Sequence, residues 1–186
     1  MIVVLDEAVP TSELSCAGCG GALRPWGFAR VRSVRCRGGL RRQVRPRRAR
    51  CPSCRVTHVL LPAVYVPRRA DALEVIGTAL LAKAAGHWHR AIATELGVAA
   101  GTVRGWLRRT AARAQWVRAE ATGLAQLADP LLGAAQPTAT GSALGDALDA
   151  LGRTVVTVVR RLGPIARPWP LAAVIARGRL LAPLRD

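Results

Sequence analysis

Two Cys-x-x-Cys pairs are the residues in this chain whose type and spacing most clearly predict chemistry. Cys16 and Cys19 form one pair, Cys51 and Cys54 form the other, and 31 residues separate the pairs. Four thiolates at this spacing suit one tetrahedral Zn²⁺, because each pair can chelate the ion from a tight turn. Four thiolates leave no coordination position for water, so the pattern predicts a structural zinc site rather than a catalytic one.

The residues around each pair fit such turns unequally. Gly20 follows the first pair and suits the backbone bend that the turn needs. Pro52 lies inside the second pair and fixes φ there. Arg55 stands where the second turn would more comfortably have a glycine. The sequence therefore predicts two similar turns, of which the second carries a mild departure.

Other uses of the thiols stay open. One pair could be a redox dithiol, or some thiols could simply be buried, although neither pair has the βαβ surroundings of a redox motif. Cys36, the fifth cysteine, is predicted to be a small core residue. His58 follows Cys54 by four residues and could replace a ligand, but we interpret it as a core or surface histidine.

The positive charge of the chain is large and uneven. The net charge is +17, and residues 14–70 contain fourteen arginines and no carboxylate. Such a field attracts nucleic acid or an anionic membrane surface. Arginines between the cysteine pairs are candidate phosphate contacts, namely Arg41, Arg42, Arg45, Arg47 and Arg48.

The N-terminus and the hydropathy predict a cytoplasmic protein with no membrane partner. Met1–Ala8 carries Asp6 and Glu7 and lacks the basic start and apolar run of a signal peptide. No stretch of about eighteen uncharged apolar residues is present. In the cytoplasm, paired cysteines favour a metal over a disulfide.

Residues 1–66 are predicted to form a small β zinc ribbon. Gly38-Gly39 is a hairpin turn signal between two extended runs, and Pro62 ends the last strand. Aromatic residues and valines are too few for a large core, so the metal is expected to supply stability. The predicted strands cover Ile2–Leu5, Trp26–Cys36, Leu40–Arg50 and Thr57–Leu61.

The remainder is predicted to be mainly helical, which makes the chain α+β. Residues 67–118 form a helix-turn-helix domain, 119–141 a loose linker that includes Gln136-Pro137, and 142–186 a helical C-terminal segment. The first helix carries Leu73, Ile76, Leu80 and Leu81, and the stripe after Ser142 comprises Leu144, Leu148, Leu151, Val155 and Leu162. The predicted helices cover Ala70–Ala85, His89–Leu96, Ala100–Val117 and a stretch from Ser142 to Gly163, with a short helix after Pro168-Trp169-Pro170.

The run from His89 to Arg108 has the residue pattern of a DNA-binding helix-turn-helix. Gly97 occupies the turn, where φ is expected to be positive, and Ala93 is small where two helices cross. The residues predicted to face the interior are Ile92, Leu96, Val98, Val103 and Trp106. An ordinary helical hairpin is the alternative interpretation.

The outward face of the second helix is small or basic, which favours DNA. Ala100 and Gly101 let the helix approach the floor of the major groove, and Arg104 and Arg108 can bind guanine. Phosphate contacts, which position the protein without reading sequence, are predicted for Thr102, Arg109 and Arg90. Because exposed aromatic candidates are not evident, stacking on single strands is not expected.

The order of these parts resembles the N-terminal heads of bacterial insertion-sequence transposases. It is closer still to small bacterial proteins that keep this head, with its Cys-x-x-Cys pairs, the run Thr57–Pro62 and the helix-turn-helix. The resemblance covers residues 14–110. It implies DNA binding but not catalysis, because the residues after it are too few for an RNase H-like domain with three carboxylates. The acidic residues there are Glu120, Asp129, Asp146, Asp149 and Asp186.

The sequence therefore predicts a non-catalytic, sequence-specific DNA-binding protein, either a transcriptional regulator or a transposase-like accessory protein. The alternative is a protein-interaction module or a relic of a transposase without its catalytic domain. A homodimer through residues 142–162 would fit either function, because the apolar stripe must pack on the chain itself or on another copy. An enzyme is the weakest hypothesis.

Overall fold

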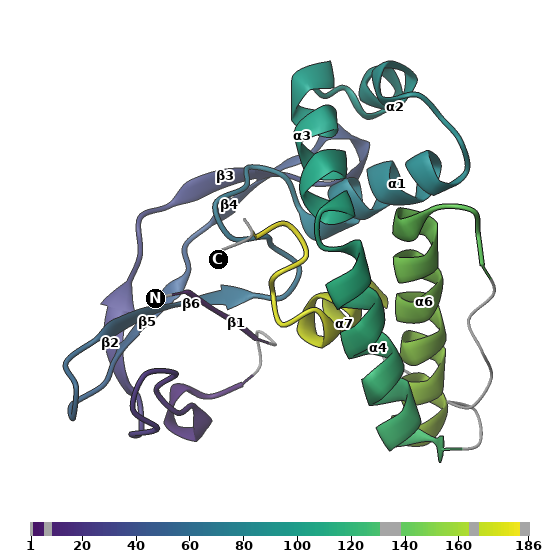
Figure 1. The fold of residues 1–186 in the computed structure, drawn as a ribbon. Helices are drawn as coiled ribbons and strands as arrows, with labels where there is room; N and C mark the ends of the chain where they lie inside the picture. The colour runs from purple at the N-terminus through teal and green to yellow at the C-terminus, as the bar shows by residue number, and fades with distance from the viewer. Residues whose placement is uncertain (1, 6–8, 131–138, 164–167, 183–186) are drawn as a thin grey trace.

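The computed structural model describes residues 2–5, 9–130, 139–163 and 168–182, and its fold is α+β, with short strands first and helices after them (Figure 1). Two 3₁₀ turns, η1 and η2, span Thr11–Glu13 and Arg37–Gly39. The strands are β1 Ile2–Leu5, β2 Arg24–Phe28, β3 Arg32–Arg35, β4 Arg41–Val44, β5 Arg47–Arg50 and β6 Thr57–Pro62. The helices are α1 Leu73–Ala84, α2 His89–Leu96, α3 Ala100–Ala111, α4 Ala114–Ala128, α6 Ala143–Leu162 and α7 Pro168–Ile175.

The strands form a four-stranded sheet and a separate hairpin. The sheet order is β1-β6-β5-β2, so the predicted strand over Ile2–Leu5 is confirmed as β1, which lies at an edge and is parallel to β6. The predicted hairpin turn is also confirmed, because Gly38 and Gly39 have φ of 70° and 75° between β3 and β4. The prediction of two continuous extended runs is wrong, since each run divides into two strands. Pro46, which has no N–H to donate, lies between β4 and β5.

Helix α1 starts three residues later than predicted, because residues 70–72 continue the pairing of β3. The backbone N–H of Arg35 donates to Ala70 O at 2.7 Å, and the N–H of Ala72 donates to Arg35 O at 2.8 Å. The predicted stripe on α1 is buried except at one position, since the side chain of Leu81 is 52% exposed. The ribbon and the helical domain are therefore joined by backbone hydrogen bonds.

The single helix predicted over residues 100–117 is wrong. It divides at residues 112–113 into α3 and α4, and α4 continues to Ala128, inside the segment predicted as a linker. The break allows Val117 and Ala121 of α4 to be buried in the helical core. The predicted Gln136-Pro137 lies outside the described residues.

Helix α6 runs beside α4 (Figure 1) and begins as predicted after Ser142, whose hydroxyl accepts a hydrogen bond from the N–H of Gly145 at 3.0 Å. The hydroxyl of Thr154 donates to Ala121 O on α4 at 2.8 Å. The apolar stripe on α6 is mostly covered by the chain itself, because Leu144, Leu148 and Leu151 are buried. Within the described ranges, no helix combines the length and the apolar character that crossing a membrane would require.

Helix α7 closes the helical core. Its Trp169 ring lies against Gly77 of α1, where a Cβ atom would overlap the ring. The buried core of the helices includes Ile76, Trp106 and Leu151, and is separate from the two small clusters of the ribbon. The C-terminal helix is therefore part of the same packed unit as the helix-turn-helix.

Candidate metal centre and basic cleft

Strand pairing brings the two cysteine pairs together. Arg24 of β2 lies opposite Arg50 of β5, and Cys51 follows Arg50 directly in the chain. On the other side, Ser15 and Ala22 form a bridge that closes the loop holding Cys16 and Cys19. The antiparallel register therefore places one Cys-x-x-Cys turn beside the other.

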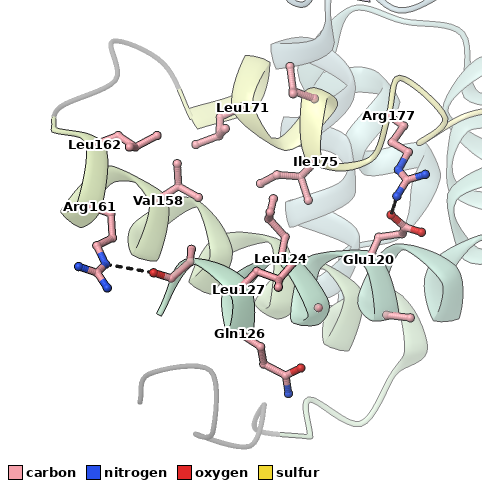
Figure 2. A pocket seen from close by; sticks show the side chains of 14 residues that line it. Glu120, Leu124, Gln126, Leu127, Val158, Arg161, Leu162, Leu171, Ile175 and Arg177 are labelled. Atoms are coloured by element: carbon pink, nitrogen blue, oxygen red, sulfur yellow. Dashed lines mark hydrogen bonds and ion pairs between the residues drawn. The ribbon is translucent and has the colours of Figure 1, made fainter. Parts of the chain in front are cut away.

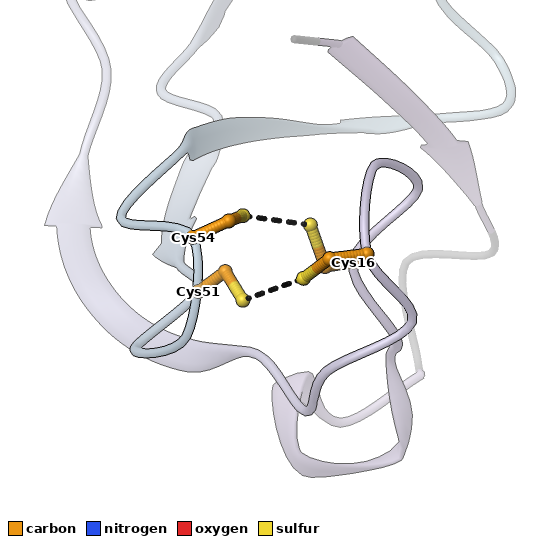
Figure 3. A group of neighbouring side chains, drawn as sticks. Cys16, Cys51 and Cys54 are labelled. Atoms are coloured by element: carbon orange, nitrogen blue, oxygen red, sulfur yellow. Dashed lines mark hydrogen bonds between the residues drawn. The ribbon is translucent and has the colours of Figure 1, made fainter.

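The sulfur atoms of Cys16, Cys19, Cys51 and Cys54 all lie within 4.8 Å of one another and could hold a metal ion. Figure 3 shows the sulfur atoms facing one another from the two loops. The Sγ–Sγ distance is 3.5 Å both between Cys16 and Cys54 and between Cys19 and Cys51. All four thiols are free, because a disulfide would require about 2.05 Å. Cys16 and Cys51 are buried, whereas the other two cysteines face solvent.

The two cysteine turns have matching backbones. The N–H of Cys16 donates to Gly21 O at 2.8 Å, and the N–H of Cys51 donates to Val56 O at 3.0 Å, five residues ahead in each case. The residue after each pair is left-handed, with φ of 74° at Gly20 and 60° at Arg55. The departure noted at Arg55 is therefore a backbone conformation that glycine adopts more easily.

Replacing Arg55 by glycine is expected to stabilise the ribbon. A left-handed conformation costs an ordinary L-residue about 1–2 kcal/mol, so R55G should raise the free energy of unfolding by about 1 kcal/mol. Denaturant unfolding at saturating metal measures the change. The matched variant is G20A. A Cβ atom at Gly20 would meet no other atom within 4 Å, so this substitution adds only the cost of a left-handed backbone at residue 20. A lower stability for R55G would contradict the prediction.

The thiols do not share one pKa. The backbone N–H of Cys54 is the main cause that lowers the pKa of Cys51 to about 6, and Gly18, whose N–H donates to the sulfur, lowers that of Cys16. The N–H of Val56 also lowers the pKa of Cys54, but interactions with Cys19, burial and the other two thiols outweigh it and raise this pKa to about 12. Burial and the neighbouring thiols therefore oppose ionisation of Cys54, whereas backbone N–H groups favour ionisation of Cys51 and Cys16.

His58 and Cys36 lie outside the group of four. His58 is fully buried, which confirms a core histidine, and burial lowers its pKa. Its Nε2 is 3.2 Å from Cys16 Sγ, so the neutral ring can donate a hydrogen bond to that sulfur. Cys36 is half-buried beside the cluster that contains Val34, in agreement with its prediction as a small core residue.

The helix-turn-helix forms where the sequence predicts it. Gly97 ends α2 with φ of 60°, and the next residue, Val98, donates its N–H to Ala93 O at 2.9 Å. Leu96 is half-buried against the helical core. Four of the residues that are predicted to face the interior are buried, namely Ile92, Val98, Val103 and Trp106.

The predicted DNA contacts divide into exposed and half-buried residues. The Arg109 guanidinium is half-buried and donates to Gly105 O at 3.0 Å, so one of its donors already has a partner. Ala100 is half-buried and packs on the helical core, which limits its outward face. The exposed members are Arg90, Gly101, Thr102, Arg104 and Arg108.

A cleft of about 840 Å³ lies along α3, and it gathers arginines from three segments. We call it the basic cleft. Asp71 is the one carboxylate in its lining. Of the predicted contacts, it includes Gly101, Thr102, Arg104, Arg108 and Arg109, but neither Arg90 nor Ala100. The arginines that the sequence did not indicate are Arg35, Arg68 and Arg69.

Arg35 ties the ribbon hairpin to the helix-turn-helix. Its Nη1 donates to Gly97 O in the helix-turn-helix at 2.6 Å, and its Nε lies 3.4 Å from Asp71 Oδ1. Burial raises the pKa of Asp71, while the charges of Arg35 and Arg41 oppose that rise. Arg35 therefore supports the wall of the cleft as well as contributing charge to it.

The positive charge of Arg69 lies near the positive charge of Arg109. Burial, followed by the charge of Arg109, lowers the pKa of Arg69. Within the described ranges, the buried Nε of Arg69 has no hydrogen-bond partner. An anion in the basic cleft would relieve both effects.

The candidate phosphate contacts of the ribbon are not equally exposed. Arg41, Arg42 and Arg45 face solvent, whereas Arg47 and Arg48 on β5 are half-buried. The Nη2 of Arg47 donates to Val9 O at 2.7 Å. Arg47 therefore also has a structural contact within the ribbon.

The expectation that exposed aromatic residues are missing is wrong. The side chains of Trp26 and Phe28 are 51% and 55% exposed on β2, which is an edge strand of the sheet. Val31, another residue counted toward the ribbon core, is also exposed. The ribbon core is therefore smaller than the sequence suggests.

Comparison with known proteins gives one family. Residues 16–106 match a domain of unknown function, DUF6431. The matched stretch starts at the first cysteine of the cluster and ends at Trp106 of α3, so it contains the cysteine cluster and most of the helix-turn-helix. No curated protein and no solved structure matches the chain.

Proposed function

We propose that this chain is a non-catalytic, sequence-specific DNA-binding protein. The observation that carries the proposal is the basic cleft along α3, where six arginines from three segments face one carboxylate. Double-stranded DNA is the polyanion that an exposed helix of this kind fits. The function therefore rests on charge and shape around the second helix of a helix-turn-helix.

In the proposed complex, α3 enters the major groove. Arg104 and Arg108 are exposed on the helix and reach base edges, where arginine binds guanine in a bidentate manner. Arg68 and Arg69 at the side of the cleft, and Arg90 on α2, contact phosphates. The exposed arginines of the hairpin extend this contact along the neighbouring backbone.

We propose that the metal is a structural Zn²⁺ held by the four cysteines. A tetrahedron with Zn–S bonds of about 2.3 Å has sulfur atoms about 3.8 Å apart. The two close pairs at 3.5 Å and the overall limit of 4.8 Å bracket that distance. Four sulfur ligands complete the coordination, so the ion would stabilise the hairpin and not bind substrate.

The absence of catalysis is part of the proposal. Three acidic residues that follow the helix-turn-helix have arginine partners: Glu120 with Arg177 at 2.8 Å, Asp146 with Arg118, and Asp149 with Arg153. Carboxylates held this way, one on α4 and two on α6, support a structural role for each of them.

Replacing Arg104 by alanine tests the function. A preferred duplex is first selected from random duplexes with the wild-type protein. R104A is expected to bind that duplex about 10- to 100-fold more weakly, because one bidentate base contact contributes about 1–3 kcal/mol. Its affinity for random duplex should change little. Fluorescence anisotropy with both duplexes measures the two affinities.

The matched control is R160A, which removes an exposed arginine from the last turn of α6, outside the basic cleft. It should bind both duplexes like the wild type. Equal losses on preferred and random DNA would make Arg104 a phosphate contact. If R104A bound the preferred duplex as tightly as the wild type does, this result would count against recognition of the DNA sequence by α3.

A protein-interaction module is the alternative function, and one feature favours it. An apolar cleft of about 1160 Å³ opens between α4, α6 and α7 (Figure 2). Leu127 and Leu162 at its edge are 83% and 78% exposed. A homodimer through residues 142–162 stays a proposal confined to this end of α6, because the rest of the stripe is largely covered. A regulator and a mobile-element accessory protein would both use such a surface.

A further inference from the structure

Two aromatic side chains lie on the edge strand of the ribbon sheet. The chain has only seven Trp, Tyr and Phe residues, and Trp106 and Tyr65 among them are buried. Trp26 and Phe28 instead occupy β2, where all five residues are exposed. Aromatic rings left in water on an outer strand are available to a ligand.

An arginine covers each of these rings. The Arg50 guanidinium lies 4.7 Å from the centroid of Trp26, and the Arg45 guanidinium lies 5.0 Å from the centroid of Phe28. A planar cation over an aromatic face occupies the position that a nucleobase takes when it stacks. Exposed pairs of this kind are weak, so a base can displace the guanidinium, which then remains close enough for a phosphate.

The surrounding charge selects the ligand. Between residues 14 and 70 the chain has no carboxylate, and the nearest acidic residue before this range is Glu13 on η1. Arg24 on β2 and Arg48 on β5 add further positive charge. Glu13 lies on η1, which contacts β2, so the surface is predominantly basic. Aromatic faces within a predominantly basic surface are the combination found where proteins hold single-stranded nucleic acid.

We propose that the β2–β5 surface, formed by Trp26, Phe28, Arg45 and Arg50, binds unpaired bases of a single nucleic-acid strand. The two rings stack on successive bases, and the displaced arginines contact the flanking phosphates. A β-bulge at Gly27, whose φ is 75°, lies between the rings and increases the local twist, and both rings still reach solvent. The proposal does not rest on duplex reading by α3.

The test compares strands that do and do not carry bases. The probes are a labelled strand of about twelve thymidines and an abasic strand with the same number of phosphates. Wild-type protein, with its metal, should bind the thymidine strand at least about tenfold more tightly. W26A should lose about 5- to 150-fold on the thymidine strand and little on the abasic strand. F28A should lose affinity in the same way, and W26F should recover most of it.

Trp88 supplies the matched control, since it is 73% exposed and carries Lys83 at 5.5 Å from its ring but lies between α1 and α2. W88A should bind both strands within twofold of the wild type. A strand of uridine ribonucleotides of the same length distinguishes DNA from RNA. Tighter binding of the thymidine strand identifies DNA as the natural ligand, and tighter binding of the uridine strand identifies RNA.

Two results would overturn the proposal: equal wild-type affinity for the thymidine and abasic strands, or unchanged binding of the thymidine strand by both W26A and F28A. Metal content and circular dichroism of the variants show that the ribbon has folded. Duplex binding separates the two functions, since W26A should keep the duplex affinity that R104A loses. Loss of duplex and single-strand binding together would point to misfolding.

Discussion

Replacement of Cys51 by serine is expected to release the metal and unfold the ribbon while the helical core stays folded. The ribbon clusters are small, since the one that contains Cys16 and Cys51 has only five buried residues in all, and the outer strand of the ribbon sheet is exposed on every residue. Structural Zn²⁺ contributes about 10–16 kcal/mol to the folding of small zinc domains at neutral pH. The helices have a core of their own that does not include the cysteines.

Two measurements check this result. Metal released to a chelator should fall from about one equivalent per chain to near zero in C51S. Amide hydrogen exchange should become fast from β2 to β6 and remain slow in α1 and α3. The matched control is C36S, which removes a half-buried thiol outside the group of four and should keep its metal. A full equivalent of metal and slow exchange in C51S would contradict a metal-dependent ribbon.

Raising the salt concentration is expected to weaken duplex binding steeply. If Arg68, Arg69, Arg90 and the exposed arginines of the hairpin together neutralise about six phosphates, the logarithm of the affinity should fall against the logarithm of salt with a slope of about −5. Between about 50 and 200 mM salt the affinity would then fall by about 10³-fold. Anisotropy titrations on random duplex give the slope directly.

Single variants divide that slope among the arginines. R68A removes a guanidinium at the side of the basic cleft and should lower the slope by about 1. R160A, the exposed arginine of α6, should leave the slope unchanged. A flat dependence on salt in the wild type would be incompatible with a duplex held through its phosphates.

The features that the sequence predicted are those set by neighbouring residues. Cys-x-x-Cys spacing, the Gly38-Gly39 turn and the left-handed turn at Gly97 each depend on a few adjacent residues. The strain at Arg55 belongs to the same class, because one φ angle explains it. Local geometry determines the conformation of these elements so strongly that the rest of the fold has little influence on it.

The features that the sequence missed depend on contacts between distant segments. Arg68 and Arg69 reach the basic cleft only because residues 70–72 pair with β3, and no periodic pattern encodes that pairing. Trp26 is a residue type that usually packs in a core, yet it lies on the last strand of the sheet and its side chain is 51% exposed. The division between α3 and α4 also follows from packing on α6. No helix-breaking residue in the local sequence indicates this division.

In the proposed complex, the link between Arg35 and Gly97 would affect the shape of the DNA. The side chain of Arg35 fastens the hairpin to the helix-turn-helix, and two backbone hydrogen bonds fasten it to residues 70–72, so α3 in the proposed complex could not rotate within the groove without carrying the hairpin with it. A straight duplex that meets α3 in the right register would have to bend or twist to reach the arginines of β4 as well. Flexible pyrimidine–purine steps would then be favoured at positions that no side chain touches.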